Sequence, residues 1–137
     1  MTAVVVDASV AASWLFDDED DPRAEAALDT LEAAPGLAPP LWSWEMRTIL
    51  LVARRRGRLD ADGMRARVAA LADLPLALDG DHDLDHALRL AEAHGLSFYD
   101  ALYLELALRR GAALATLDGR LLAAARAEGV AVVPPDA

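Results

Sequence analysis

Short apolar runs alternate with longer stretches of mixed apolar and polar residues along this chain. The run at 2–7, "TAVVVD", is rich in valine, which is typical of a strand buried on both faces. The run "VAVVPP" at 130–135 predicts a last strand that stops at Pro134, because proline has no backbone N–H to donate to a sheet. Other short strands are expected within 34–40, 74–78 and 112–118.

The segments between these runs have the composition and end signals of helices. Pro22 suits the first turn of a helix, and Gly57 and Gly95 suit the position just after one. In "DHDLDHALRLAEAHG" one helix face gathers Leu84, Ala87, Leu88 and Ala91. Helices are therefore expected over about 8–16, 22–33, 42–56, 60–73, 81–95, 97–111 and 119–129.

This order of elements predicts the fold class. Strands that alternate with helices imply right-handed crossovers and a mainly parallel sheet with helices on both sides. The expected fold is therefore an α/β protein, a three-layer α/β/α sandwich. A chain of 137 residues can bury a sizeable core, and no repeat or linker divides it, so we expect one domain over residues 1–137.

Composition narrows the possible functions. The chain has no cysteine, which excludes disulfides, zinc–thiolate sites and cysteine nucleophiles. No uncharged apolar run approaches the roughly 18 residues that a membrane-spanning helix needs. Because the first predicted strand begins near Ala3, we expect no signal peptide and a cytoplasmic location, away from any membrane.

The charge is strongly acidic, at −10, and all 13 basic residues are arginine. This balance argues against sequence-independent binding of nucleic acid through a broad basic face. It leaves room for a local arginine patch beside a carboxylate pocket that a metal ion neutralises. The run "RRRGR" at 54–58 has two interpretations, RNA contact or an exposed helix end, and the helix dipole favours the second.

Four carboxylates are placed where a ligand site is expected. Asp7 and Asp118 end two predicted strands, Asp100 lies in the first turn of the helix at 97–111, and Glu45 lies early in the helix after 39–40. Ligands of an open parallel sheet bind beyond the carboxyl ends of its strands. Clustered carboxylates repel one another unless a cation satisfies them, and sites made only of oxygen ligands suit Mg²⁺ or Mn²⁺.

Helix capping is the alternative explanation for each acid. Asp7 and Asp118 directly precede helices, and Ser97 with Asp100 has the spacing of a capping box. Glu45 could be an exposed acid favoured by a helix N-terminus. Capping leaves unexplained why the strongest strand and two helices with apolar surroundings all place acids at one edge.

Four motifs resemble those of the PIN domain family, and in size and layout its VapC-like toxins. They are "VVVDASV" (4–10), "PPLWSWE" (39–45), "LSFYDALYLELALRRG" (96–111) and "LATLDGRLL" (114–122), in order across nearly the whole chain. The resemblance implies a metal site formed by Asp7, Glu45, Asp100 and Asp118, with Ser9 and Thr116 orienting carboxylates or water. One position departs from the family, because Thr48 stands where Asn is common, which puts that residue's supporting role in doubt.

By this resemblance the protein is a Mg²⁺- or Mn²⁺-dependent endoribonuclease, the toxin of a toxin–antitoxin pair. The same resemblance implies a homodimer that an antitoxin protein holds inactive. Within the site, we expect Asp7 and Asp100 to be direct ligands, with Asp118 and Glu45 completing the shell. The alternative is a catalytically weak PIN-like module that mainly binds another protein.

Other interpretations are weaker. A haloacid-dehalogenase-type phosphatase needs Asp where Ser9 stands, a receiver domain needs a late lysine, and a Rossmann domain needs a glycine-rich first turn.

His82 and His86 lie one helical turn apart but lack a third fixed ligand, so a structural role is favoured over a metal site. Core or dimer-interface positions, rather than stacking on RNA bases, are expected for Trp14, Trp42, Trp44, Phe98 and Tyr103.

Overall fold

The computed structural model describes residues 2–16 and 18–135, and its centre is a parallel sheet. The strands are β1 (Val4–Val6), β2 (Gly36–Ala38), β3 (Leu76–Leu78) and β4 (Ala113–Ala115), in the order β3-β2-β1-β4. Val5 of β1 pairs with Leu37 on one side and Leu114 on the other, and every strand pair is parallel. The expected mainly parallel sheet is confirmed.

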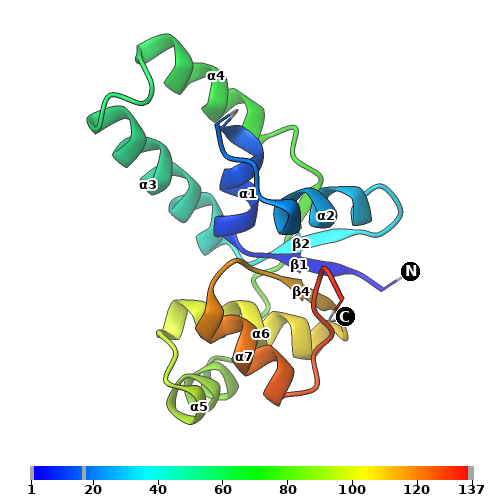
Figure 1. Cartoon of the computed structure of the whole chain (residues 1–137). Helices are drawn as coiled ribbons and strands as arrows, with labels where there is room; N and C mark the ends of the chain where they lie inside the picture. The colour runs from blue at the N-terminus through cyan, green and yellow to red at the C-terminus, as the bar shows by residue number, and fades with distance from the viewer. Residues whose placement is uncertain (1, 17, 136–137) are drawn as a thin grey trace.

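Helices cover both faces of this sheet (Figure 1). On one side lie α1 (Ala8–Leu15), α2 (Pro22–Thr30), α3 (Leu41–Arg55) and α4 (Ala61–Leu71). On the other side lie α5 (Leu84–His94), α6 (Phe98–Arg110) and α7 (Gly119–Ala127). The predicted three-layer α/β/α arrangement is therefore correct.

Local chemistry explains where several elements begin and approach one another. Asp60 caps α4 by accepting a hydrogen bond from the backbone N–H of Gly63, and Pro22 opens α2 after the Asp21 cap. At Gly36 a β-carbon would lie 2.4 Å from the carbonyl oxygen of Pro75. Only glycine therefore lets β2 run this close to the segment that leads into β3.

Helix α6 runs through the centre of the molecule. Its residues from Ala101 to Ala107 are all buried, including Tyr103 and Glu105, each 0% exposed. Gly111 ends the helix with φ of 58°, and the chain turns there into β4. Because α6 packs against α5, α7, β1 and β4, it carries Asp100 to the carboxyl edge of the sheet. No helix in the described ranges is both long enough and apolar enough to cross a membrane.

Two expectations about the elements were wrong. The segment at 130–135 forms only an isolated parallel bridge between Val132 and Leu114, because Pro134 and Pro135 have no N–H to extend the ladder. In α5 the buried residues are Ala87, Leu90 and Ala91, whereas Leu84 and Leu88 are exposed.

Candidate metal centre

Asp7 lies at the carboxyl end of β1 and is 5% exposed. Its Oδ2 atom accepts hydrogen bonds from the Thr116 hydroxyl at 2.6 Å and from the Ser9 hydroxyl at 3.0 Å. Although Asp7 precedes α1, its side chain makes no capping hydrogen bond to that helix's second or third residue. Capping thus does not explain the buried carboxylate.

The same two hydroxyl groups join the ends of β1 and β4. Thr116 Oγ1 also accepts from the backbone N–H of Asp118 at 3.0 Å, and Ser9 Oγ accepts from that of Leu117 at 3.1 Å. Each hydroxyl therefore donates to the Asp7 carboxylate and accepts from the β4–α7 turn. The turn that carries Asp118 is held beside Asp7 by these four hydrogen bonds.

Glu45 lies in the second turn of α3, and Tyr103 of α6 fixes its carboxylate. The Tyr103 hydroxyl donates to Glu45 Oε1 at 2.7 Å. Burial, together with the nearby carboxylates of Asp7 and Glu45, raises the pKa of Tyr103, so this phenol stays protonated and remains a donor. The sequence analysis assigned Tyr103 to the core or a dimer interface and missed this contact with Glu45. The signal was its position three residues after Asp100, which places both side chains on neighbouring parts of one helix face.

Asp100 and Asp118 both lie at the N-termini of helices, where capping hydrogen bonds form. Ser97 caps α6 by accepting from the backbone N–H of Asp100 at 3.1 Å, as the capping-box spacing predicted. Asp118 Oδ1 accepts from the N–H groups of Arg120 and Leu121, so the capping interpretation is correct for this residue. Its second carboxylate oxygen leaves room for a further role.

The site acids influence one another electrostatically. Burial raises the pKa of Asp7, and the Asp100 carboxylate raises it further, while the Thr116 and Ser9 hydroxyls oppose this rise. Burial also raises the pKa of Glu45, with contributions from Asp7 and Asp100. For Asp100, burial and then the charge of Asp118 raise the pKa. The four side chains therefore share one electrostatic environment.

The donor set fits a divalent cation of the magnesium type. All four side chains are carboxylates, which supply hard oxygen ligands, and no ion pair in the described part of the chain joins any of them to an arginine or histidine. Within residues 2–16 and 18–135 no three acids or histidines already stand at ligand distance from a common point. The acids therefore lie near enough to influence one another electrostatically, but among the described residues no three of them are placed to hold one ion together.

A hollow of about 350 Å³ opens beside Glu45 between α3 and the start of α6. Its lining residues are Leu41, Trp44, Glu45, Thr48, Ile49 and Tyr99. Trp44 is 68% exposed and Tyr99 is 63% exposed, so Trp44 lies outside the core, and of its two expected positions the dimer interface stays a prediction. The helical spacing of α3 could have predicted this exposure. Trp42, Met46 and Leu50 form the buried face of the helix, and Trp44 lies on a different face.

Thr48 lines this hollow one turn after Glu45. Across the described residues, no hydrogen bond connects it to a site carboxylate. Its expected role in supporting those acids therefore stays a prediction.

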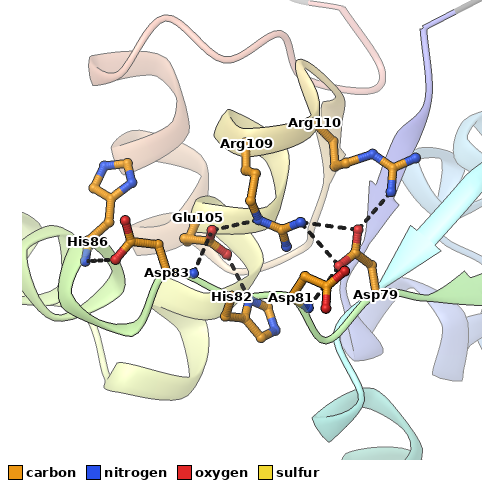
Figure 2. A network of polar contacts seen from close by, with 8 residues as sticks. All are labelled: Asp79, Asp81, His82, Asp83, His86, Glu105, Arg109 and Arg110. Atoms are coloured by element: carbon orange, nitrogen blue, oxygen red, sulfur yellow. Dashed lines mark hydrogen bonds and ion pairs between the residues drawn. The ribbon is translucent and has the colours of Figure 1, made fainter.

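A second group of acids joins Glu105 of α6 to the segment that follows β3, and its partners are different (Figure 2). The Glu105 carboxylate accepts from His82 Nδ1 at 2.7 Å, Arg109 Nε at 2.8 Å and the backbone N–H of Asp83 at 3.2 Å. Asp79 pairs with Arg109 and Arg110. The expectation that His82 and His86 lie one turn apart on a helix was wrong, because His82 precedes α5 and only His86 lies within it, and Figure 2 shows their imidazole rings apart.

Comparison with known proteins places the chain in a family. The model of the PIN domain matches residues 4–127, so the chain belongs to the PIN domain family, as its motifs predicted. Comparison with curated proteins gives no match.

Two solved structures are similar to it. PAE2754 from Pyrobaculum aerophilum matches with a TM-score of 0.73 and 26% identity, over 96% of this chain and 90% of that one. VapC20 (Rv2549c) from Mycobacterium tuberculosis, described as a sarcin–ricin loop cleaving toxin, matches with a TM-score of 0.60 and 19% identity. That match covers 88% of this chain and 94% of VapC20, and at this identity it shows a shared fold.

Proposed function

We propose that this protein is a divalent-metal-dependent endoribonuclease, the toxin of a toxin–antitoxin pair. The observation that supports this most is Asp7, a buried carboxylate that receives two hydroxyl hydrogen bonds and has no cation beside it among the described residues. A buried charge of this kind is costly unless a cation meets it. Membership of the PIN domain family and the fold shared with the toxin VapC20 support the same proposal.

Each site residue has a proposed role. Asp7 and Asp100 would hold Mg²⁺ or Mn²⁺ directly, and Glu45 and Asp118 would complete the shell directly or through water. A bound divalent ion lowers the pKa of a coordinated water and offsets negative charge on a phosphodiester. Thr116 and Ser9 keep the Asp7 carboxylate in one orientation, as groups behind metal ligands do. Tyr103 does the same for Glu45.

The partners follow from the same proposal. RNA is the substrate, a second copy of the chain forms a homodimer, and a cognate antitoxin protein blocks the site in the cytoplasm. Because the chain carries a net charge of −10, its bulk field repels RNA. Substrate binding then depends on the metal ion and on local arginines.

Cleavage of RNA by the purified protein tests this function. Asp7→Asn and Asp100→Asn should each lower Mg²⁺-dependent cleavage by more than about 100-fold, because loss of a group behind the ligands alone typically costs about 10–100-fold. Thr116→Val should fall within that smaller range. The measurement is the rate of cleavage of labelled single-stranded RNA during a Mg²⁺ titration.

Asp73→Asn is the matched control, because Asp73 is an exposed carboxylate that follows α4. It should cleave like the wild type. Full activity of the Asp7→Asn protein would contradict the proposed site. A wild-type protein that binds a partner but cuts no RNA at any Mg²⁺ or Mn²⁺ concentration would instead indicate a binding module.

A further inference from the structure

The parallel sheet has two outer edges, and a described segment of the chain covers only one of them. On the outer side of β4, Leu114 donates to the Ala131 carbonyl at 2.9 Å and accepts from the Val133 N–H at 3.0 Å. The opposite outer strand is β3, and among the described residues nothing pairs with its outer side. Proteins usually cover or charge such an edge, because its free backbone groups can pair with another strand.

The pairing with β2 determines which backbone groups of β3 point outward. Asp79 donates its N–H to the Ala38 carbonyl at 2.9 Å, so Asp79 faces β2, and so does Ala77 two residues before it. Successive residues of a strand direct their backbone groups to opposite sides. Leu76 and Leu78 therefore direct theirs away from the sheet.

Four free backbone groups form this outer edge. They are the C=O of Leu76, the N–H and C=O of Leu78 and the N–H of Gly80, and no hydrogen bond in the described part of the chain uses them. Gly80 still runs beside the extension of β2, because a β-carbon there would lie 3.1 Å from the Pro40 ring. The Leu76 N–H is not free, since it donates to the Leu74 carbonyl at 2.8 Å.

The order of these groups is complementary to itself. From Leu76 to Gly80 the edge presents an acceptor, a donor, an acceptor and a donor. An identical strand that runs antiparallel presents the reverse order. If the two strands are centred on Leu78, every free donor meets a free acceptor, and none of the four groups is left over.

The side chains of the edge are apolar and uncharged. Residues 74–78 carry no charge, and Leu78 is 51% exposed. Leu76 and Leu78 lie on one face of the sheet, where they line a hollow of about 250 Å³ together with Trp42 and residues of α4. The acid that follows, Asp79, is paired with two arginines of α6, so it does not repel a second acidic chain at this edge.

We propose that the β3 edge of one copy pairs antiparallel with the β3 edge of a second copy, centred on Leu78, so that the two sheets become one continuous sheet. This inference rests on the homodimer of the proposed function and names the surface that forms it. The two-fold axis passes between the two Leu78 residues, which cover each other. Leu76 of each copy lies opposite Gly80 of the other, where no side chain competes for space.

Cross-linking at position 78 tests this pairing, because the chain contains no cysteine. In a hydrogen-bonded antiparallel pair the α-carbons of opposite residues lie about 5.5 Å apart, which suits a disulfide. Mild oxidation of the Leu78→Cys protein should therefore give a covalent dimer on a non-reducing gel. The matched control is Leu84→Cys, because Leu84 is 58% exposed on α5, and it should run as a monomer on the same gel.

Charge at the same position tests the two-fold axis. Leu78→Lys and Leu78→Glu each place like charges opposite each other, and each should raise the dissociation constant of the dimer by more than about 10-fold. An equimolar mixture of the two variants should dimerise again, because opposite charges then face each other. Leu84→Lys is the control and should dimerise like the wild type. Analytical ultracentrifugation measures all four.

The outcomes separate this interface from the proposed function. A wild-type dimer that Leu78→Lys leaves intact, or equal cross-linking of Leu78→Cys and Leu84→Cys, would overturn the β3 interface but leave the homodimer in place. A wild type that is monomeric at every concentration would overturn the interface and the homodimer together, and RNA cleavage would still test the ribonuclease. Normal dimers of the Leu78 variants with loss of another protein partner would show that the edge binds that partner, and the inference would be wrong.

Discussion

Asp7 and Glu105 are both buried carboxylates beside the same helix, yet their environments are opposite. Burial raises the pKa of Asp7, and its partners are two neutral hydroxyl groups and a like-charged neighbour, Asp100. Glu105 is also desolvated, but its hydrogen bonds from Arg109, His82 and the Asp83 backbone hold its pKa below the usual range. Burial alone therefore does not identify a ligand site in this protein.

The two carboxylates differ in whether a positively charged side chain neutralises them. The protein supplies Glu105 with a cation of its own, and the resulting network ties the Asp79–Asp83 segment after β3 to α6 (Figure 2). Two hydroxyl groups orient the Asp7 carboxylate, but within the described residues no positively charged side chain pairs with it. A carboxylate that is fully paired has its charge compensated within the fold, whereas one that is oriented and unpaired can bind an external cation.

The largest effect expected from this comparison is the loss of Glu105. Glu105→Gln removes the charge that receives hydrogen bonds from Arg109 and His82, while Arg109 keeps Asp79 as a partner. Loss of hydrogen bonds to a charged group typically costs about 1.5–3 kcal/mol in the free energy of unfolding. Urea denaturation measures it, with the exposed Glu92→Gln on α5 as control, expected within about 0.5 kcal/mol of the wild type. If Glu105→Gln changed the free energy of unfolding as little as the control does, the hydrogen bonds and ion pairs of Glu105 would only balance the cost of removing its charge from water.

The next effect has the opposite sign. Without metal, Asp7→Asn should raise the free energy of unfolding at neutral pH by about 1 kcal/mol, or the melting temperature by roughly 2–6 °C, because the variant buries no unpaired charge. Since the folded-state pKa of Asp7 is raised above 3.8, its stability contribution is present at low pH and is lost as the pH rises through the raised pKa.

A pH series of thermal melts measures this difference. The advantage of Asp7→Asn over the wild type should grow from acidic to neutral pH, and Asp73→Asn should show no such trend. Glu105 provides the reverse case, because its lowered pKa gives stability that is present above pH 4.5 and is lost as the pH falls. A metal-free Asp7→Asn protein less stable than the wild type at neutral pH would show that Asp7 is already compensated.

The smallest effect is stabilisation by the ion itself. Mg²⁺ or Mn²⁺ at about three times its Kd should stabilise the wild type by about 0.8 kcal/mol, because the ion binds the folded state. Asp7→Asn and Asp100→Asn should lose this shift in melting temperature, and Glu105→Gln should keep it relative to its own metal-free baseline. An equal shift in all three variants would place the ion outside the Asp7 site.

Much of the fold could be predicted from the sequence because local signals agree with the tertiary structure. The valine run at β1, the Asp caps of α4 and α5 and the glycine after α6 each act over a few residues. The last strand was predicted wrongly because its propensity is high, whereas its pairing depends on N–H groups that Pro134 and Pro135 lack. The exposure of Leu84 and Leu88 likewise depended on which face α5 turns toward α6.

The order of the elements, the family motifs and the positions of the acids at strand and helix ends could all be predicted from the amino-acid sequence. Which carboxylates are paired could not, because Glu105 contacts His82 across 23 residues of chain and Asp7 contacts Thr116 across 109. The tertiary structure also turned Trp44 outward beside Tyr99. Charge compensation and exposure depend on three-dimensional distance, and that distance is set by packing between segments far apart in the sequence.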